Sequence, residues 1–458
     1  MKRSAALLAA VALAACTMIP DYERPAPPVP EAFPGAQEAG TPAAQLDWRE
    51  FLADERLRAV VEQALAGNRD LRVATLNVER VGALLSIRRS ELWPAIGVQG
   101  AGQRIQLPEK MTDSGEAEVV ERYAVEVGFL SWEIDLFGRL RSLSASALEQ
   151  YLATEEGERA ARSALVAATA SSWLRLAADV EALRLAEATL AAQADSLGMI
   201  RASRDAGVAS DLELRQAESQ VEAARVNRAE FAGAIAVDRH ALELLMGGPL
   251  APELEPEGIH ALAGTAAIAS GLPSEVLLAR PDILAAEHRL RSANADIGAA
   301  RAAFFPRISL TAALGTLSPD LSGLFHSGTR TWRVEPVVQT PIFAGGGLRA
   351  NLRATKIERE IAVAVYEKAI QTAFAEVADG LALAATLAEQ RQAQDALVFA
   401  LEETLRLSEE RYRAGIDGYL GVLVAQQALF RAQQSSVLLR FAERANRVRL
   451  YKALGGGA

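Results

Sequence analysis

Phe304-Phe305-Pro306-Arg307-Ile308 ends a helical stretch that begins at Pro281-Asp282-Ile283, and an earlier part of the chain carries the same arrangement. There, Leu92-Trp93-Pro94-Ala95-Ile96 ends a stretch of the same length that begins at Arg69-Asp70-Leu71. The two copies lie about 210 residues apart, a spacing far longer than the roughly 20–50 residues of a solenoid repeat. The sequence therefore predicts one large unit that is duplicated, with each half forming the same structure.

Helices are predicted on the N-terminal side of both prolines. Apolar residues recur at three- and four-residue spacing over residues 52–65 and 71–92, and again over 274–278 and 283–305. Pro94 and Pro306 are expected to end the second helix of each copy, because proline cannot continue a helix.

The segments that follow both prolines change to an alternating pattern. Apolar side chains occupy every second position from Tyr123 to Phe129 and from Ile308 to Leu314, a period of two that predicts β-strands. Residues 332–335 alternate in the same way and residues 96–99 less cleanly, so the pattern gives four strands of about ten residues. They form one hairpin per copy, at about 95–133 and about 307–343. Pro336 lies inside the fourth strand and predicts a bulge or an earlier strand end there.

The length of these strands suits a lipid bilayer, which about 9–11 tilted residues can cross. A sheet edge cannot be left open in lipid, because its amides would have no hydrogen-bond partners. Four strands cannot close a barrel alone, so the sequence predicts oligomerisation, and three chains would supply twelve strands. The alternative is a small soluble sheet packed on helices.

Two proline-free runs, 140–204 and 348–413, predict helices far longer than a globular domain needs. Each would reach about 100 Å at roughly 1.5 Å per residue. The partner helices, 211–246 and 419–454, return after breaks at Gly207 and Gly415. The chain should therefore form two helical hairpins, at about 138–246 and about 346–454, and a wall of such helices would form a tube.

Composition supports long helices and argues against several functional classes. Half of the 458 residues are hydrophobic, but aromatic residues make up only 5%. The formal charge is −10, which makes the chain a poor binder of nucleic acid. The four histidines are scattered without ligand spacing, so no metal is expected. Gly345-Gly346-Gly347 lacks the Gly-Lys-Ser/Thr ending of a phosphate loop, so neither a cofactor nor an enzyme activity is predicted.

The N-terminus predicts export. Residues 1–15 have the basic and short apolar regions of a signal peptide rather than of a membrane span. Leu13-Ala14-Ala15-Cys16 resembles a bacterial lipobox, which implies cleavage before Cys16 and lipidation of this only cysteine. Thr17 follows where an aspartate would mean inner-membrane retention, which favours the outer membrane. The alternative is an ordinary signal peptide with an incidental cysteine. Residues 16–47 are Pro-rich and are expected to form an extended tether between the lipid and the body of the protein.

These features together resemble the outer-membrane factor (TolC-like) family, in particular its lipoprotein branch typified by OprM and NodT. The resemblance rests on the lipobox, the Pro-rich segment, the duplicated entries to strand hairpins and the paired glycine turns. It also includes Trp132-Glu133-Ile134-Asp135-Leu136-Phe137-Gly138 against Thr340-Pro341-Ile342-Phe343-Ala344-Gly345-Gly346. It covers essentially the whole mature chain.

The resemblance implies an α+β membrane protein that is internally duplicated. The expected assembly is a homotrimer with a twelve-stranded β-barrel, four strands per chain, in the outer membrane, continued by a long α-helical barrel through the periplasm. Members serve as passive exit ducts of tripartite efflux or secretion systems. The implied partners are outer-membrane lipid, a periplasmic adaptor (membrane fusion) protein and an inner-membrane transporter, which dock at the periplasmic tips.

The resemblance also implies roles for residues at the tips. Gly207 and Gly415 fall at the two turns, where glycine permits a tight reversal. The first turn is flanked by Arg204 and Asp211, and the second by Arg411, Tyr412, Asp417, Tyr419 and Leu420. These residues are expected to take part in adaptor docking and in the gate. The alternative is that the charged ones only cap helices and form the turns.

The gate departs from the pattern of family members that close with a ring of acids beyond this turn. Gly421 and Val424 stand there in this chain, so a gate would use Asp417 or Asp211, or an apolar constriction at Leu420 or Val424. If the chain's negative charge faced inward, the lumen would favour cations.

The expected division of the chain is a signal peptide at 1–15, the lipid-anchored tether at 16–47, a first repeat at 48–250, a linker at 251–273 and a second repeat at 274–458. The competing functional hypothesis is a lipid-anchored coiled-coil protein without a pore. Such a protein would have no need for alternating strands. An enzyme is a more distant alternative.

Overall fold

The computed structural model describes residues 17–34, 41–262, 265–266, 268–269 and 273–457. The predicted signal peptide and Cys16 lie outside the described residues. The chain divides into two compact units, each assembled from separate segments of the sequence. The first contains residues up to 26 together with 77–155 and 285–366, and the second contains 27–76, 156–284 and 367–458.

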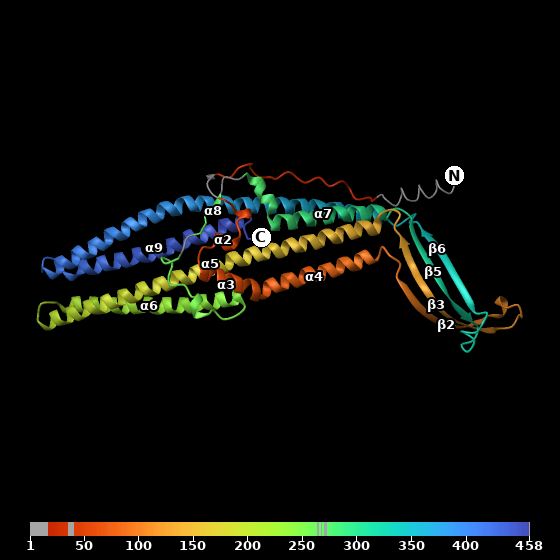
Figure 1. The fold of residues 1–458 in the computed structure, drawn as a ribbon, viewed down its shortest axis with the longest axis horizontal. Coiled ribbons are helices and arrows are strands. Elements are labelled where there is room, and N and C mark those ends of the chain that lie inside the picture. The colour runs from red at the N-terminus through yellow and green to blue at the C-terminus, as the bar shows by residue number, and fades with distance from the viewer. Residues whose placement is uncertain (1–16, 35–40, 263–264, 267, 270–272, 458) are drawn as a thin grey trace. The chain divides into compact units, whose positions relative to one another are not determined.

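The first unit contains the predicted four-stranded sheet. Its strands are β2 (Ile96–Leu107), β3 (Glu118–Ile134), β5 (Arg307–Ser318) and β6 (Arg330–Gln339). They pair antiparallel in the order β2-β3-β5-β6, so each copy contributes one hairpin and the hairpins join through β3 and β5 (Figure 1). The predicted strands are confirmed, although β3 is longer than expected at 17 residues.

The prediction of a bulge or strand end at Pro336 is wrong. β6 continues to Gln339, and Pro336 stays in register with Leu310. β6 is an edge strand of this sheet, and a residue without an N–H is tolerated on an edge strand. The irregularity lies instead in β3, where the register shifts between Phe129 and Trp132 and Ser131 has a positive φ of 53°.

Helices α4 (Arg69–Ser90) and α7 (Pro281–Ala302) precede the two hairpins. Both end four residues before the prolines that were expected to stop them. The residues between form turns, in which the Trp93 N–H donates to Ser90 at 3.0 Å and the Phe305 N–H to Ala302 at 3.0 Å. The residue before a proline is disfavoured in a helix, so the stop acts earlier than the proline itself.

The start of the N-terminal Pro-rich segment is hydrogen-bonded to α7. In the first unit, Asn294 Nδ2 donates to the Pro20 carbonyl at 2.8 Å and Arg301 donates to the Met18 carbonyl at 3.2 Å. Arg24 binds Glu287 with two hydrogen bonds, of 3.0 and 2.7 Å. An extended chain leaves its carbonyls unpaired, and these side chains of α7 satisfy them.

The second unit contains most of the long helices. α5 (Arg139–Asp205) and α8 (Gly347–Arg413) are each 67 residues long, and α6 (Asp211–Met246) and α9 (Tyr419–Ala453) return along them as two hairpins (Figure 1). The core between them is built largely from alanine, leucine and valine, with Trp173 as its largest fully buried side chain. Within the described residues, no helix is both long and apolar enough to span a membrane.

Shorter elements complete the two units. They are β1 (Thr41–Pro42), η1 (Ala43–Gln45), α2 (Trp48–Phe51), α3 (Glu55–Gly67), η2 (Glu109–Met111), η3 (Pro252–Leu254), β4 (Ile268–Ala269) and η4 (Ser274–Ala279). The parallel pairing of β1 with β4 was not predicted, because two residues per strand are too few to show a period.

Candidate functional site

Residues that oppose each other across strands share a face of the sheet. In the first unit this pairing gives one largely apolar face and one largely polar face. The apolar face carries Ile96, Val98, Tyr123, Val125, Val127, Phe129, Trp132, Leu310, Ala312, Leu314, Trp332, Val334 and Val338. The opposite face carries Gln99, Gln103, Arg122, Glu126, Glu133, Ser309, Thr311, Thr331, Arg333 and Glu335. Large members of the apolar face are solvent-exposed in the single chain, including Val98 at 75% and Trp332 at 74%. This face therefore has to be covered by apolar surroundings.

The bulge in β3 preserves this division. Phe129 and Trp132 are three positions apart and would point to opposite faces of a regular strand. The extra residue restores Trp132 to the apolar face, opposite Leu310, and leaves Glu133 opposite Ser309 on the polar face.

The two tip turns of the second unit have the same backbone geometry. Gly207 has a φ of 77° and donates to Arg204 at 2.9 Å, while Val208 donates to Ser203 at 2.9 Å. Gly415 has a φ of 70° and donates to Tyr412 at 2.9 Å. This is the Schellman ending, which places a left-handed residue directly after the helix. The predicted turns at both glycines are confirmed.

Each tip turn is crossed by an arginine–aspartate pair. Arg204 Nε lies 3.0 Å from Asp211, and Arg411 contacts both carboxylate oxygens of Asp417, at 2.5 and 3.1 Å. The hydrogen bond from Arg411 holds the pKa of Asp417 below its usual value. Both pairs are exposed, so they organise the turns more than they stabilise the fold.

The two return helices, α6 and α9, begin in different ways. Ser210 caps α6 with a capping box, in which Ser210 and Glu213 satisfy each other's backbone N–H. Gly418 precedes α9 and offers no side-chain cap. The sequence difference between Ala209-Ser210-Asp211 and Asp417-Gly418-Tyr419 is thus a difference in how firmly each return helix begins.

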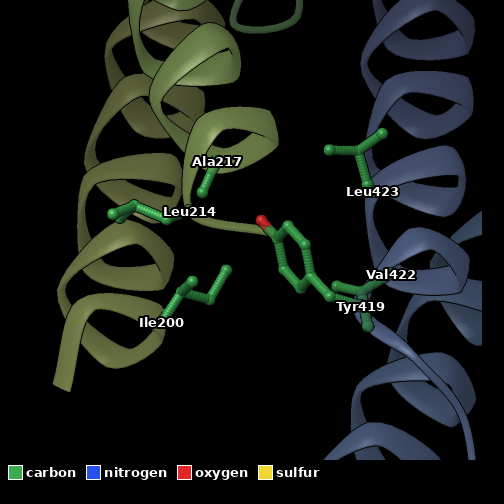
Figure 2. Packing of buried hydrophobic residues seen from close by; sticks show 6 residues of the cluster. All are labelled: Ile200, Leu214, Ala217, Tyr419, Val422 and Leu423. Atoms are coloured by element: carbon green, nitrogen blue, oxygen red, sulfur yellow. The ribbon is translucent and has the colours of Figure 1, made fainter. Parts of the chain in front are cut away.

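Tyr419 is the centre of a buried cluster that joins the two helical hairpins. The cluster contains Ile200 from α5, Leu214 and Ala217 from α6, and Tyr419, Val422 and Leu423 from α9 (Figure 2). Tyr419 is 2% exposed, and burial raises the pKa of its hydroxyl. Its ring also meets that of Tyr412 edge to face, with centroids 5.6 Å apart.

Two amide pairs join the hairpins farther from the tip turns than this cluster. Gln193 of α5 donates to Gln426 of α9 at 3.0 Å, and Gln427 of α9 donates to Gln220 of α6 at 2.8 Å. These contacts are between neutral groups, so a shift of one hairpin against the other would leave no charged group unpaired there.

Leu420 and Val424 behave differently from the cluster residues. They lie one helical turn apart on α9, and 57% and 56% of their surfaces are exposed in the single chain. A Cβ added at Gly421 between them would meet no atom within 4 Å. They form an apolar strip that is available for contact outside this chain.

The structure thus brings together the residues predicted around each turn, and it adds others that were missed. Ile200, Leu214, Ala217 and Val422 carry no special signal, because leucine, alanine and valine fill both hairpins. Heptad spacing on the last helix could identify Leu423, but not its partners on α5 and α6.

Comparison with known proteins gives consistent matches over most of the chain. The family model described as outer membrane efflux protein matches residues 60–248 and again residues 272–456. The probable efflux pump outer membrane protein TtgC of Pseudomonas putida is 44% identical over 452 residues, which covers 97% of this chain and 93% of TtgC. The outer membrane protein OprJ of Pseudomonas aeruginosa is 42% identical, and the match covers 99% of this chain and 95% of OprJ.

Solved structures agree with these matches. The open state of the MtrE outer membrane channel from Neisseria gonorrhoeae superposes with a TM-score of 0.88 at 37% identity. The match covers 96% of this chain and 98% of that one.

Proposed function

Because the chain belongs to the outer membrane efflux protein family, we propose that it forms the exit duct of a tripartite efflux system. Three chains would close a twelve-stranded barrel in the outer membrane and continue it as a helical barrel through the periplasm. The duct would conduct passively, and an inner-membrane transporter would supply the energy.

The two-faced sheet is the observation that carries this proposal. An exposed apolar face and an opposite polar face are what a barrel strand presents to lipid and to a water-filled lumen. β2 and β6 are the edges of the sheet, and pairing between neighbouring chains would satisfy their amides. The competing coiled-coil protein without a pore gives no reason for this sheet.

The tips are the proposed docking site for a periplasmic adaptor protein and the transporter. Arg204, Gly207, Asp211, Arg411, Tyr412, Gly415 and Asp417 surround the two turns. Gly207 and Gly415 each face open space, so a partner backbone could approach them closely. Differential contact of the adaptor with the closed and open tips would open the duct.

We propose that the closed constriction is apolar rather than acidic. Asp211 and Asp417 are each neutralised by an arginine across the turn. Leu420 and Val424 form an exposed apolar strip on α9, directly beyond the second turn. Three such strips around a threefold axis would close a pore by excluding water.

The N-terminus and the repeats complete the proposal. Residues 1–15 would be removed, Cys16 would carry the lipid, and residues 48–250 and 274–458 would form the two repeats. The relatives named as toluene and antibiotic efflux proteins suggest small organic solutes as cargo.

Planar-bilayer recording tests the duct and the gate together. The purified protein should be a trimer and give stepwise conductance. Leu420→Ser combined with Val424→Ser should raise the open probability, because a polar constriction does not expel water. Asp417→Asn, the control, should leave it unchanged. A folded trimer without conductance in both the parent and the serine pair would exclude the duct. Opening by Asp417→Asn and not by the serine pair would make the gate acidic.

A further inference from the structure

Arg333 of β6 reaches across β5 to bind Glu126 of β3 on the polar face of the sheet. The Arg333 guanidinium donates to Glu126 Oε2 at 2.7 Å. Between them on β5 lie two small residues, Ala313 opposite Arg333 and Gly315 opposite Glu126. The arginine therefore bridges two strands that are not neighbours.

The strand beneath this pair is shaped to receive it. A Cβ at Gly315 would lie 2.9 Å from Glu126 Cγ and 2.1 Å from the Val125 carbonyl oxygen. Any side chain at position 315 would thus displace Glu126. Glycine here allows the carboxylate to lie down over β5.

Burial is consistent with a pair that lies along the wall, since the side chains of Glu126 and Arg333 are 18% and 40% exposed. Ala313 lies in the middle of β5 and is only 6% exposed. Arg333 Nε is also buried, and within the described residues it finds no hydrogen-bond acceptor. The inner edge of the guanidinium therefore faces the sheet. β5 has a strand of the same chain on each side, so neighbouring chains are not needed for this burial.

We propose that Glu126 and Arg333 form a wall clamp that sets the bore and the ionic character of the barrel lumen. The proposal rests on the proposed duct. While the clamp holds, the arginine lies along the wall and its charge is matched by the carboxylate. If the clamp is broken, a long cationic side chain projects into the path of the cargo.

The clamp belongs to a polar face on which positive and negative charges nearly balance. The arginines on this face are Arg122, Arg307 and Arg333, and the carboxylates are Glu118, Glu126, Glu133 and Glu335. The overall negative charge of the chain is therefore not concentrated on this face. A wall with so little net charge suits cargo of either sign, which fits an exit duct whose selectivity is set by its pump.

A cysteine at position 313 measures the clamp directly. The sequence has one cysteine, Cys16, so Ala313→Cys supplies a defined reporter, and the parent without it corrects for background. A membrane-impermeant methanethiosulfonate reagent is added from outside the outer membrane, so the state of the periplasmic tip does not limit its access. Modification should be slow in the reporter. It should be on the order of tenfold faster with Glu126→Gln, because a charge-assisted hydrogen bond is lost.

Glu335→Gln is the matched control. It removes the same charge from the same face, but Glu335 lies 3.8 Å from Arg333 and is 56% exposed, so the Glu126 contact remains. The rate of modification at position 313 should stay within about twofold of the reporter, since exposed pairs of this kind contribute little. Equal acceleration by both variants, or none by Glu126→Gln, would overturn the clamp.

Two further variants keep the test decisive. If Glu126→Gln reduces trimer yield, the exchange of Glu126→Arg with Arg333→Glu should restore both trimer and slow modification. Gln99→Cys, on the same polar face of β2, should react readily in every background. Failure of that position to react in a folded trimer would refute the water-filled duct itself, independently of the clamp.

Discussion

Gly207 and Gly415 show how single residues shape the tips. Both end a helix of 67 residues in the left-handed conformation, with φ values of 77° and 70°. Neither is crowded, because a Cβ at either position would meet no atom within 4 Å. The constraint is thus conformational rather than steric, and it acts on backbone energy alone.

Gly415→Ala should therefore weaken the second tip without creating a clash. The left-handed conformation costs an L-residue about 1–2 kcal/mol. We expect faster amide hydrogen exchange in the turn, equivalent to a loss of about 1 kcal/mol in local opening free energy. Gly421→Ala is the control six residues away in α9, where alanine should instead stabilise by up to ~1 kcal/mol. Equal protection from hydrogen exchange in the two variants would contradict this prediction.

The sequence identifies some of these residues and misses others for a physical reason. A glycine between two proline-free helical runs identifies a turn, and arginine and aspartate on either side suggest a pair across it. The role of Tyr419 was not predictable in this way, because its burial depends on Ile200 and Leu214, more than two hundred residues earlier in the chain. No local pattern encodes that distance.

At the scale of elements, α5 and α6 are joined by an acidic contact. Arg175 and Asp179 of α5 face Asp238 of α6, with Arg175 Nε 3.4 Å from Asp179 and 3.8 Å from Asp238. Burial, followed by a hydrogen bond with Asp179, raises the pKa of Asp238 to about 6. The folded hairpin therefore binds a proton that the unfolded chain releases more readily.

The stability of this hairpin should fall as pH rises. Because the folded pKa of Asp238 is the higher one, the loss begins near the unfolded value of 3.8 and is complete above about 6. Asp238→Asn should remove this dependence and raise the melting temperature at pH 7 more than at pH 4.5. Circular dichroism of the trimer measures both.

Arg175→Gln provides the opposite change. The arginine lowers the pKa of Asp238, so its removal should deepen the loss of stability at pH 7. A melting temperature for Asp238→Asn that follows the same pH profile as the parent would contradict the assignment.

The strands show how far an element can be read from its period. Alternation located all four strands and their pairing into hairpins. It could not locate the bulge at Ser131, because the extra residue interrupts the alternation and looks the same as the end of a strand. It also misjudged Pro336, since the effect of a proline depends on whether its strand lies at an edge.

At the scale of the whole molecule, duplication gives each chain two strand hairpins and two helical hairpins. Within the described residues, the sheet ends at β2 on one side and at β6 on the other. Both edges and the apolar face remain uncovered in one chain. In a closed barrel in lipid, both edges are paired and the apolar face is covered. The fold of one chain therefore depends on the assembly.

The two faces of β3 provide the sharpest test of this assembly. Val127 lies on the apolar face and Ala124 on the polar face of the same strand. A lysine facing lipid near the bilayer midplane costs about 2–4 kcal/mol, whereas one facing a water-filled lumen is solvated. Val127→Lys should therefore sharply reduce the yield of heat-modifiable trimer in the outer membrane, and Ala124→Lys should leave most of it. Because both variants add the same charge to the same strand, equal losses would mean that the faces are not divided between lipid and water.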